Sequence, residues 1–281
     1  MNRCWKRVLR ARVGPWRGAV SSGGDRDGLE GLLLAAPSGN ELSRSRFENV
    51  GEVHAQIGVN WGPCGNNCGF CVLAESTGLA KTQTEFTKEE VVRLALRFEM
   101  EGADAISLMS TATYDFYSFL DIGRASRKAL KSDIPVCASI GGLDVESARA
   151  VRGTGFSAIY HARRLREGVD TKIDPRTRIS TIKAAKAASL GVSSCVEPIV
   201  SEHTEEEIVG EIFECKDLGV VMATMKRIPV PGSLLHSRRM TIQAEFAKIV
   251  AVARLVTGNS IVGMGVHEPN VLSLMAGANA L

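Results

Sequence analysis

The feature that most constrains the fold is a regular alternation of short β-branched runs with longer amphipathic stretches from Val53 onward. Seven runs are predicted to be strands: Val53–Val59, Ala105–Met109, Val136–Ile140, Ala158–His161, Ser194–Val200, Val220–Lys226 and Ser260–Val266. The stretches between them have helical periodicity, and two capping-box pairs, Thr87 with Glu90 and Thr204 with Glu207, mark helix starts. Strand–helix repeats of this kind form a parallel sheet covered by helices. The sequence therefore predicts an α/β fold, a full or partial parallel (β/α) barrel whose last strand, Ala278–Leu281, is cut short at the chain end.

The first 48 residues differ from the rest in composition. Six cations precede the first acid, Asp25, namely Arg3, Lys6, Arg7, Arg10, Arg12 and Arg17. Residues 19–48 are rich in Gly and Ser apart from Leu29–Ala36, for which one short helix is expected. A disordered tail is the simplest interpretation, and a targeting or polyanion-binding arm is the alternative. We expect a basic segment over residues 1–48, with ordered structure beginning near Asn49, and one barrel domain over residues 49–281.

The composition excludes several classes of protein. Of 281 residues 44% are hydrophobic and 5% aromatic, and the net charge is +3, so neither a disordered chain nor a dedicated nucleic-acid surface is predicted. No apolar stretch reaches the length of about 18 residues that a transmembrane helix needs. Seven cysteines, an odd number over a long chain, argue against a secreted disulfide framework. The sequence predicts a cytoplasmic enzyme that binds neither a membrane nor nucleic acid.

The strongest chemical signal is the loop Cys64-Gly-Asn-Asn-Cys68-Gly-Phe-Cys71, which follows the first predicted strand. Three thiols on a Gly-rich loop suit a single metal centre. A structural zinc site needs four protein ligands, and no fourth Cys or His lies nearby in the sequence. An iron–sulfur cluster held by three cysteines keeps one iron open for an outside ligand, which is a catalytic arrangement. A cluster is favoured, with zinc as the alternative.

The cysteine spacing, with Phe70 just before the third cysteine, resembles the signature of the radical S-adenosylmethionine (radical SAM) superfamily. Residues 248–254 and 260–265 and the ending Leu274–Asn279 resemble the closing third of its biotin synthase-like and methylornithine synthase-like branch. The segments Cys137–Gly141 and Pro231–Ser233 fit the same pattern. The likeness covers residues 50–281, is strongest at the two ends and is looser between them.

The resemblance implies a 4Fe–4S cluster on Cys64, Cys68 and Cys71, with S-adenosylmethionine bound to its open iron and cleaved reductively to a radical that abstracts hydrogen from a substrate. It also implies cofactor contacts from five positions, Phe70, Ser110, Thr111, His161 and Arg178, with Arg176 competing with Arg178 for the methionine carboxylate. At the first four of these positions, an ordinary packing or hydrogen-bonding role is the alternative. The implied partners are a small-molecule substrate and an electron donor such as flavodoxin or ferredoxin, and the resemblance allows a homodimer.

Glu197 stands out because a carboxylate in an apolar strand is costly to bury unless it meets a cation or a ligand. Pro198 predicts that the strand ends there, which would put Glu197 at the barrel mouth. We expect Glu197 and His161 to contact substrate, with a structural ion pair as the alternative for Glu197. Lys226 and Arg227 end the next strand and either bind an anionic substrate or pair with Glu197 or Asp115.

The reaction subclass depends on a second cluster that biotin synthase holds with three further cysteines and an arginine. Cys137 and Cys195 fall on two of those positions, whereas Leu108 and Gly263 fall at the other two. Isolated cysteines in strands are ordinary core residues. The predicted function is therefore hydrogen abstraction from a small metabolite or cofactor precursor, in a rearrangement or in cofactor biosynthesis. Sulfur insertion, and a non-catalytic iron–sulfur or zinc protein, are the alternatives.

Overall fold

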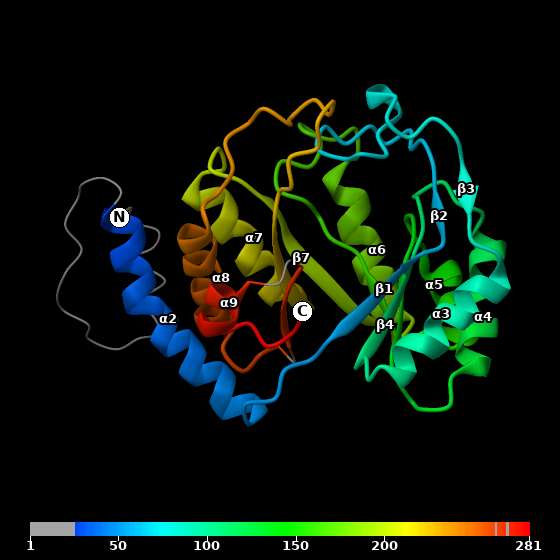
Figure 1. Cartoon of the computed structure of the whole chain (residues 1–281), viewed down its shortest axis with the longest axis horizontal. Helices are drawn as coiled ribbons and strands as arrows, with labels where there is room; N and C mark the ends of the chain where they lie inside the picture. Colours follow the sequence, from blue (N-terminus) through cyan, green and yellow to red (C-terminus); the bar gives the residue numbers. More distant parts are fainter. Residues whose placement is uncertain (1–25, 262, 268–269) are drawn as a thin grey trace. The chain divides into compact units, whose positions relative to one another are not determined.

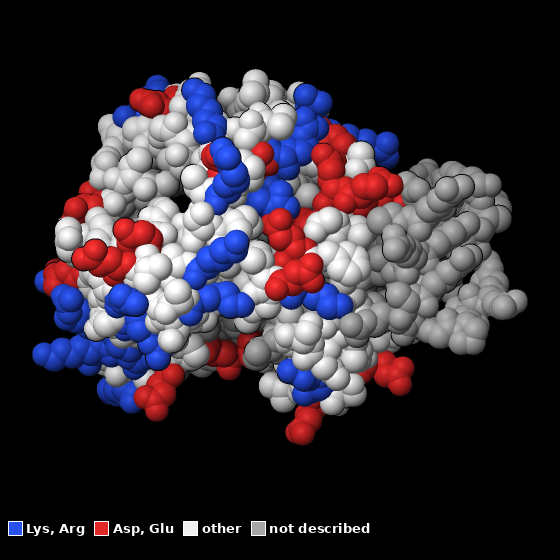
Figure 2. All heavy atoms as spheres, turned by 180° about the vertical axis from the view of Figure 1, so that it is seen from behind, with Lys and Arg blue, Asp and Glu red and all other residues white. Residues whose placement is uncertain are grey.

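The computed structural model describes residues 26–261, 263–267 and 270–281 (Figure 1). The six cations of the predicted basic tail lie outside these ranges. None of the helices in the described ranges is both long and apolar enough to cross a membrane. Lys and Arg side chains are interspersed with Asp and Glu on the face shown in Figure 2, as the small net charge predicts.

The central element is a seven-stranded sheet in the order β1-β4-β5-β6-β7-β8-β9. Its strands are β1 (His54–Gly58), β4 (Ala105–Met109), β5 (Val136–Ser139), β6 (Ala158–Tyr160), β7 (Gly191–Ile199), β8 (Val221–Lys226) and β9 (Met264–Val266). The strand order follows the chain order and the neighbours run parallel, as in the pairs Ile57↔Leu108 and Met222↔Met264. The predicted partial parallel (β/α) barrel is confirmed. At the predicted eighth strand, Ala280 forms a single parallel bridge with Gly265.

The chain divides into two compact units. Unit A comprises Glu52–Ser194 and Ile228–Arg238, and unit B comprises Cys195–Arg227, Arg239–Leu281 and the described residues up to Gly51.

Unit A contains strands β1 to β6 and the first residues of β7. Its helices are α3 (Lys88–Met100), α4 (Phe116–Ala129), α5 (Val145–Thr154) and α6 (Pro175–Ala187), with a short 3₁₀ helix η1 (Glu75–Thr77) and an antiparallel pair β2 (Asn60–Trp61) and β3 (Thr84–Glu85). The sheet residues Ile106, Leu108 and Ile159 are almost fully buried. Thr87 and Glu90 form the predicted capping box at the start of α3. Phe119 and Phe156 stack with their ring centroids 5.5 Å apart, and Gly123 is required there because a Cβ would lie 2.3 Å from the Phe156 ring.

Unit B contains α2 (Arg26–Phe47), α7 (Glu205–Leu218), α8 (Gln243–Thr257) and α9 (Val271–Met275), together with β8 and β9. Thr204 and Glu207 form the predicted capping box of α7. Phe246, Val250 and Ile212 are fully buried in its core.

Helix α2 is the main departure from prediction, because it covers residues for which mostly irregular chain was expected. Its buried positions Leu32, Ala35, Gly39 and Ser43 form one helical stripe of mostly small residues. At Gly39 a Cβ would lie 2.4 Å from the Ala276 carbonyl oxygen and 3.4 Å from the Ala251 Cα. The small residues permit close packing of α2 against α8 and α9, so residues that suggested a loop are interface residues here (Figure 1).

Candidate functional site

The cysteine loop belongs to unit A and is folded back on itself. The Cys64 N–H donates to the Leu73 carbonyl oxygen at 2.7 Å, and the Cys64 carbonyl accepts from Glu75 N–H at 3.1 Å. Cys71 N–H donates to the Cys68 carbonyl at 2.9 Å. Cys64, Cys68 and Cys71 are free, half-buried thiols. The backbone bonds thus hold three thiols on one short, ordered turn.

Residues that the sequence analysis did not single out fix this loop. Asn67 adopts a left-handed conformation (φ 47°) and accepts from Ser76 N–H at 2.7 Å through Oδ1. Gly69 N–H donates to the Asp170 carbonyl at 2.8 Å, and the Gly69 carbonyl accepts from Leu235 N–H at 3.0 Å. A Cβ at Gly69 would lie 3.3 Å from both the Asp170 oxygen and the Leu235 side chain. Two segments far apart in the sequence therefore clamp the loop at a position where only glycine fits without displacement.

The donor set of the loop is three thiols and no fourth cysteine. A structural zinc site takes four protein ligands, whereas an iron–sulfur cluster held by three cysteines keeps one iron open for an outside ligand. The chemistry of the donor set therefore suits an iron–sulfur cluster. Burial raises the pKa of the Cys68 thiol to about 11, and the nearby Arg164 partly opposes that rise. Binding of a metal centre must therefore displace a proton at Cys68.

His161 follows β6 and is held by its N–H, which donates to the Ser193 carbonyl at 2.9 Å. The side chain is 4% exposed, and Nε2 makes no hydrogen bond to any described residue. Burial, together with the charges of Arg178 and Arg164, lowers the pKa of His161 to about 3. The imidazole is therefore neutral at physiological pH, with a buried ring nitrogen available to a ligand.

Arg178 and Arg176 occupy different environments on α6. Arg176 is 89% exposed and pairs with its own helix cap, Asp174, at 2.6 Å. The Arg178 side chain is only 13% exposed, and its Nε lies 3.4 Å from Oε2 of Glu167. Glu167 is fully buried and also accepts from Arg164 N–H and Thr171 Oγ1, each at 2.9 Å. Arg178, held by Glu167 and close enough to Cys68 and His161 to shift their pKa values, is the stronger candidate.

Two hydroxyl side chains at the end of β4, Thr111 and Ser110, differ in their hydrogen bonds. Thr111 Oγ1 accepts from Asn60 Nδ2 at 2.9 Å, and Thr111 N–H donates to Asn60 Oδ1 at 2.9 Å. The Ser110 Oγ is buried and makes no hydrogen bond to the residues described. Phe70, the third predicted contact near the cysteines, is half-buried. Ser110 therefore keeps a free donor, whereas Thr111 is already engaged by Asn60, a residue the sequence analysis overlooked.

Glu197 lies in unit B and is 2% exposed. The predicted end of its strand at Pro198 is wrong, since β7 continues to Ile199. The Pro198 nitrogen carries no hydrogen for a ladder bond, yet the next bond of the ladder, from Arg227 N–H to the Ile199 carbonyl at 2.9 Å, is present. Arg227 pairs with Glu202 at 3.1 Å, a partner that was not predicted from the sequence.

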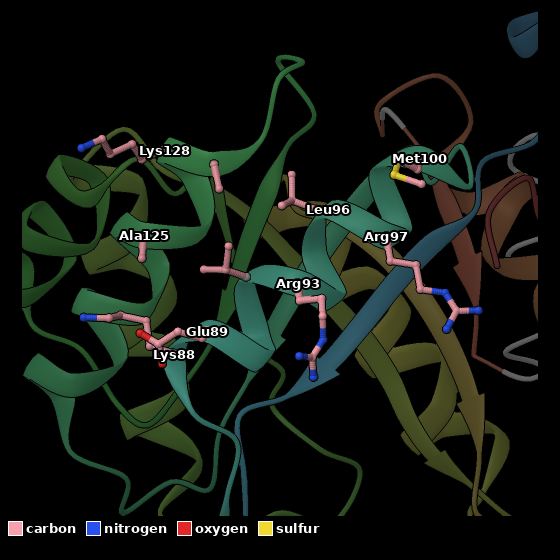
Figure 3. Close-up of a pocket in the computed structure, with 10 residues that line it drawn as sticks. Lys88, Glu89, Arg93, Leu96, Arg97, Met100, Ala125 and Lys128 are labelled. Carbon is pink, nitrogen blue, oxygen red and sulfur yellow. The ribbon is translucent and has the colours of Figure 1, made fainter.

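A groove on the outer surface of unit A runs between α3 and α4 (Figure 3). Leu96, Ala125 and Met100 line it, and Arg93, Arg97 and Lys128 lie along its edges. None of the predicted site residues is among those that line this groove.

No family model matches the chain. The chain is 27% identical to the biotin synthase of Pelotomaculum thermopropionicum, over 94% of this chain and 85% of the relative. It is 28% identical to the biotin synthase of Carboxydothermus hydrogenoformans, over 93% of this chain and 88% of the relative. This chain is a radical SAM enzyme similar to the biotin synthases. The cofactors of this radical SAM enzyme are a 4Fe–4S cluster and S-adenosylmethionine.

Two solved structures superpose on most of this chain. Methylornithine synthase superposes with a TM-score of 0.78 at 17% identity, over 99% of this chain and 84% of that chain. The hydrogenase maturase HydG superposes with a TM-score of 0.76 at 14% identity, over 99% of this chain and 66% of that chain. At these identities the likeness establishes the partial parallel (β/α) barrel fold alone. The alternative of a non-catalytic binding protein is set aside by the sequence relatives.

Proposed function

We propose that Cys64, Cys68 and Cys71 hold the 4Fe–4S cluster and that the enzyme abstracts hydrogen from a small metabolite or cofactor precursor, in a rearrangement or in cofactor biosynthesis. The observation that carries this proposal is the ordered turn of three free thiols, clamped at Gly69. When bound, the cluster supplies one electron for the reductive cleavage of S-adenosylmethionine, which starts hydrogen abstraction. We propose a flavodoxin or ferredoxin as the electron donor, and the cytoplasm as the location.

The residues of unit A provide polar contacts for S-adenosylmethionine. Arg178 binds its carboxylate with a charge-assisted hydrogen bond, because Glu167 fixes the guanidinium while leaving its terminal nitrogens available. Ser110 Oγ and His161 Nε2 form hydrogen bonds with the methionine or ribose groups, as donors or as acceptors. Both atoms are buried and have no hydrogen bond to the described residues. Phe70 covers the cysteine turn, where its ring excludes water. Thr111 acts through Asn60, which fixes the end of β4.

Glu197 is proposed to recognise an amine or hydroxyl of the substrate, and Glu197→Gln tests this. The substitution keeps the shape of the side chain and removes its charge, so the iron content should stay at the parent level. Stimulation of S-adenosylmethionine cleavage by the small-molecule fraction of a cell extract should fall about tenfold or more. The measurement is 5′-deoxyadenosine released with and without that fraction.

Glu41→Gln, an exposed change on α2, is the matched control and should behave as the parent. Loss of the cluster or of the fold in Glu197→Gln would make Glu197 a structural ion-pair partner. Unchanged stimulation would place substrate recognition elsewhere, with His161 and Lys226 next to be tested.

Sulfur insertion is the second candidate, because the sequence relatives are named biotin synthase. It would need Cys137 and Cys195 as ligands of a further cluster. Burial raises the pKa of Cys137 to about 12, Ser107 hydrogen-bonds to it, and Cys195 is fully buried. The third position is Leu108, which is fully buried and apolar. These properties favour packing roles for both cysteines, so hydrogen abstraction without a second cluster is the function we propose.

A further inference from the structure

Arg227 is a buried arginine at the carboxyl end of a strand, and the roles proposed above do not use it. It directly follows β8, and its N–H donates to the Ile199 carbonyl of β7 at 2.9 Å. The residue is 3% exposed. Its Nη1 donates to Oε1 of Glu202 at 3.1 Å, and the Glu202 side chain is 18% exposed. One end of the guanidinium is therefore fixed and neutralised within unit B.

The other edge of this guanidinium is not used by the fold. Nε and Nη2 of Arg227 are buried and make no hydrogen bond within the described part of the chain. A buried donor without an acceptor lowers the stability of a fold, and more so when the donor is charged. Nε and Nη2 lie side by side on the guanidinium, and this edge is the one that takes two oxygens of a carboxylate or phosphate at once.

Arg254 shows what the same edge does when its role is structural. It is also fully buried in unit B, but its Nε donates to the Gly277 carbonyl at 2.8 Å and its Nη2 to Oδ1 of Asn279 at 2.7 Å. Both arginines are thus buried. They differ at the Nε–Nη2 edge, where Arg254 donates to two protein oxygens and Arg227 donates to none in the described part of the chain. The difference indicates that the partner of Arg227 is a ligand.

We infer that Arg227 binds an oxyanion of the substrate, a carboxylate or a phosphate, through its Nε–Nη2 edge. The inference rests on the proposed function and adds the chemical class of the substrate. Ligands of parallel α/β folds bind at the carboxyl ends of the strands, which is where Arg227 and Glu202 lie. Glu202 holds the guanidinium in one orientation, so little side-chain freedom is lost when the oxyanion binds.

Titration of the reconstituted enzyme with three simple probes tests the inference. The probes are pentanoate, its neutral counterpart pentanamide, and inorganic phosphate, with binding followed by calorimetry and by the melting temperature. We expect an oxyanion to bind at least tenfold more tightly than pentanamide and to raise the melting temperature. Preference for pentanoate identifies a carboxylate substrate, and preference for phosphate identifies a phosphorylated one.

Arg227→Met should weaken oxyanion binding by tenfold or more, whereas the exposed control Arg176→Met should bind as the parent does. Arg227→Met should still fold, because it removes two buried donors that the described part of the chain does not pair, and the Glu202 carboxylate that loses its bond is 18% exposed and can be hydrated. The inference is overturned if neither oxyanion binds, if Arg227→Met binds equally well, or if Arg227→Met and Arg227→Lys both fail to fold.

Failure of the proposed function has a different signature. A parent protein that takes up no iron or does not cleave S-adenosylmethionine contradicts the proposed function, whatever it binds. A parent with normal iron uptake and cleavage but no response to oxyanions contradicts only the role of Arg227.

Discussion

Cys68→Ala is expected to abolish iron uptake on anaerobic reconstitution, whereas the parent should take up about four iron atoms per chain, with oxygen-sensitive absorption. Cys68 is the middle thiol of the turn, and its backbone carbonyl accepts from Cys71 N–H. Removing its sulfur leaves two protein ligands, too few to keep a cluster that already has one open iron. Iron and sulfide analysis with absorption spectroscopy provides the measurement.

Cys215→Ala is the matched control, because Cys215 is a buried cysteine on α7 with no place in the loop. It should keep the parent iron content, with only a modest loss of stability of about 1–3 kcal/mol. A Cys68→Ala protein with full iron content would contradict the assigned ligands. So would a parent that binds one zinc and no iron.

Arg254→Ala is expected to lower the free energy of unfolding by about 3–5 kcal/mol, the largest stability effect we predict. The guanidinium bonds to Gly277 and Asn279, and Asn279 Oδ1 also accepts from Met264 N–H at 2.9 Å. Gly277 has a φ of 118°, and a Cβ there would lie 2.9 Å from the Arg254 side chain. Burial lowers the pKa of Arg254 to about 10, with a smaller contribution from Arg46. Truncation would leave a cavity and two acceptors without their donors.

Arg46→Ala provides the comparison, since the Arg46 and Arg254 guanidinium groups lie 5.7 Å and 5.4 Å from the centroid of the same Phe47 ring. Arg46 is exposed and has no described bond to the Gly277–Asn279 turn, so its removal should shift the thermal midpoint little. A chain of this size should lose roughly 10 °C for Arg254→Ala. Equal midpoints for the two variants would show that the Arg254 bonds do not stabilise the fold.

Local patterns predicted the fold well where each element carried its own signal. Strand β4 matches the predicted range Ala105–Met109, and the capping boxes at Thr87 and Thr204 form as expected. Helix α2 was missed because Gly39 and Ser43 suggest a loop unless their contacts are known. The close approach of Gly39 to Ala276 depends on residues more than 200 positions away. Secondary-structure propensity depends on nearby residues and cannot predict such a contact.

The candidate site, too, could be predicted where its residues lie close together in the sequence and not where it depends on distant segments. The three cysteines lie within one segment of eight residues, so their spacing alone indicates a cluster. The Asp170 and Leu235 clamps on Gly69 and the reciprocal bonds between Asn60 and Thr111 join segments distant in sequence. Glu167 favours Arg178 over Arg176 as the candidate, because of these two arginines Arg178 is the one that pairs with a buried carboxylate. These contacts require the three-dimensional arrangement and could not be read from motifs.

The central claim is that the cysteine turn supports reductive cleavage of S-adenosylmethionine, and one measurement tests it most directly. The reconstituted enzyme is incubated anaerobically with dithionite and S-adenosylmethionine, and 5′-deoxyadenosine and methionine are quantified by chromatography. We predict that the parent and Cys215→Ala form both products in equal amounts and that Cys68→Ala forms neither. A parent that carries its full iron content yet forms no 5′-deoxyadenosine, or a Cys68→Ala protein that forms it at the parent rate, would contradict the account.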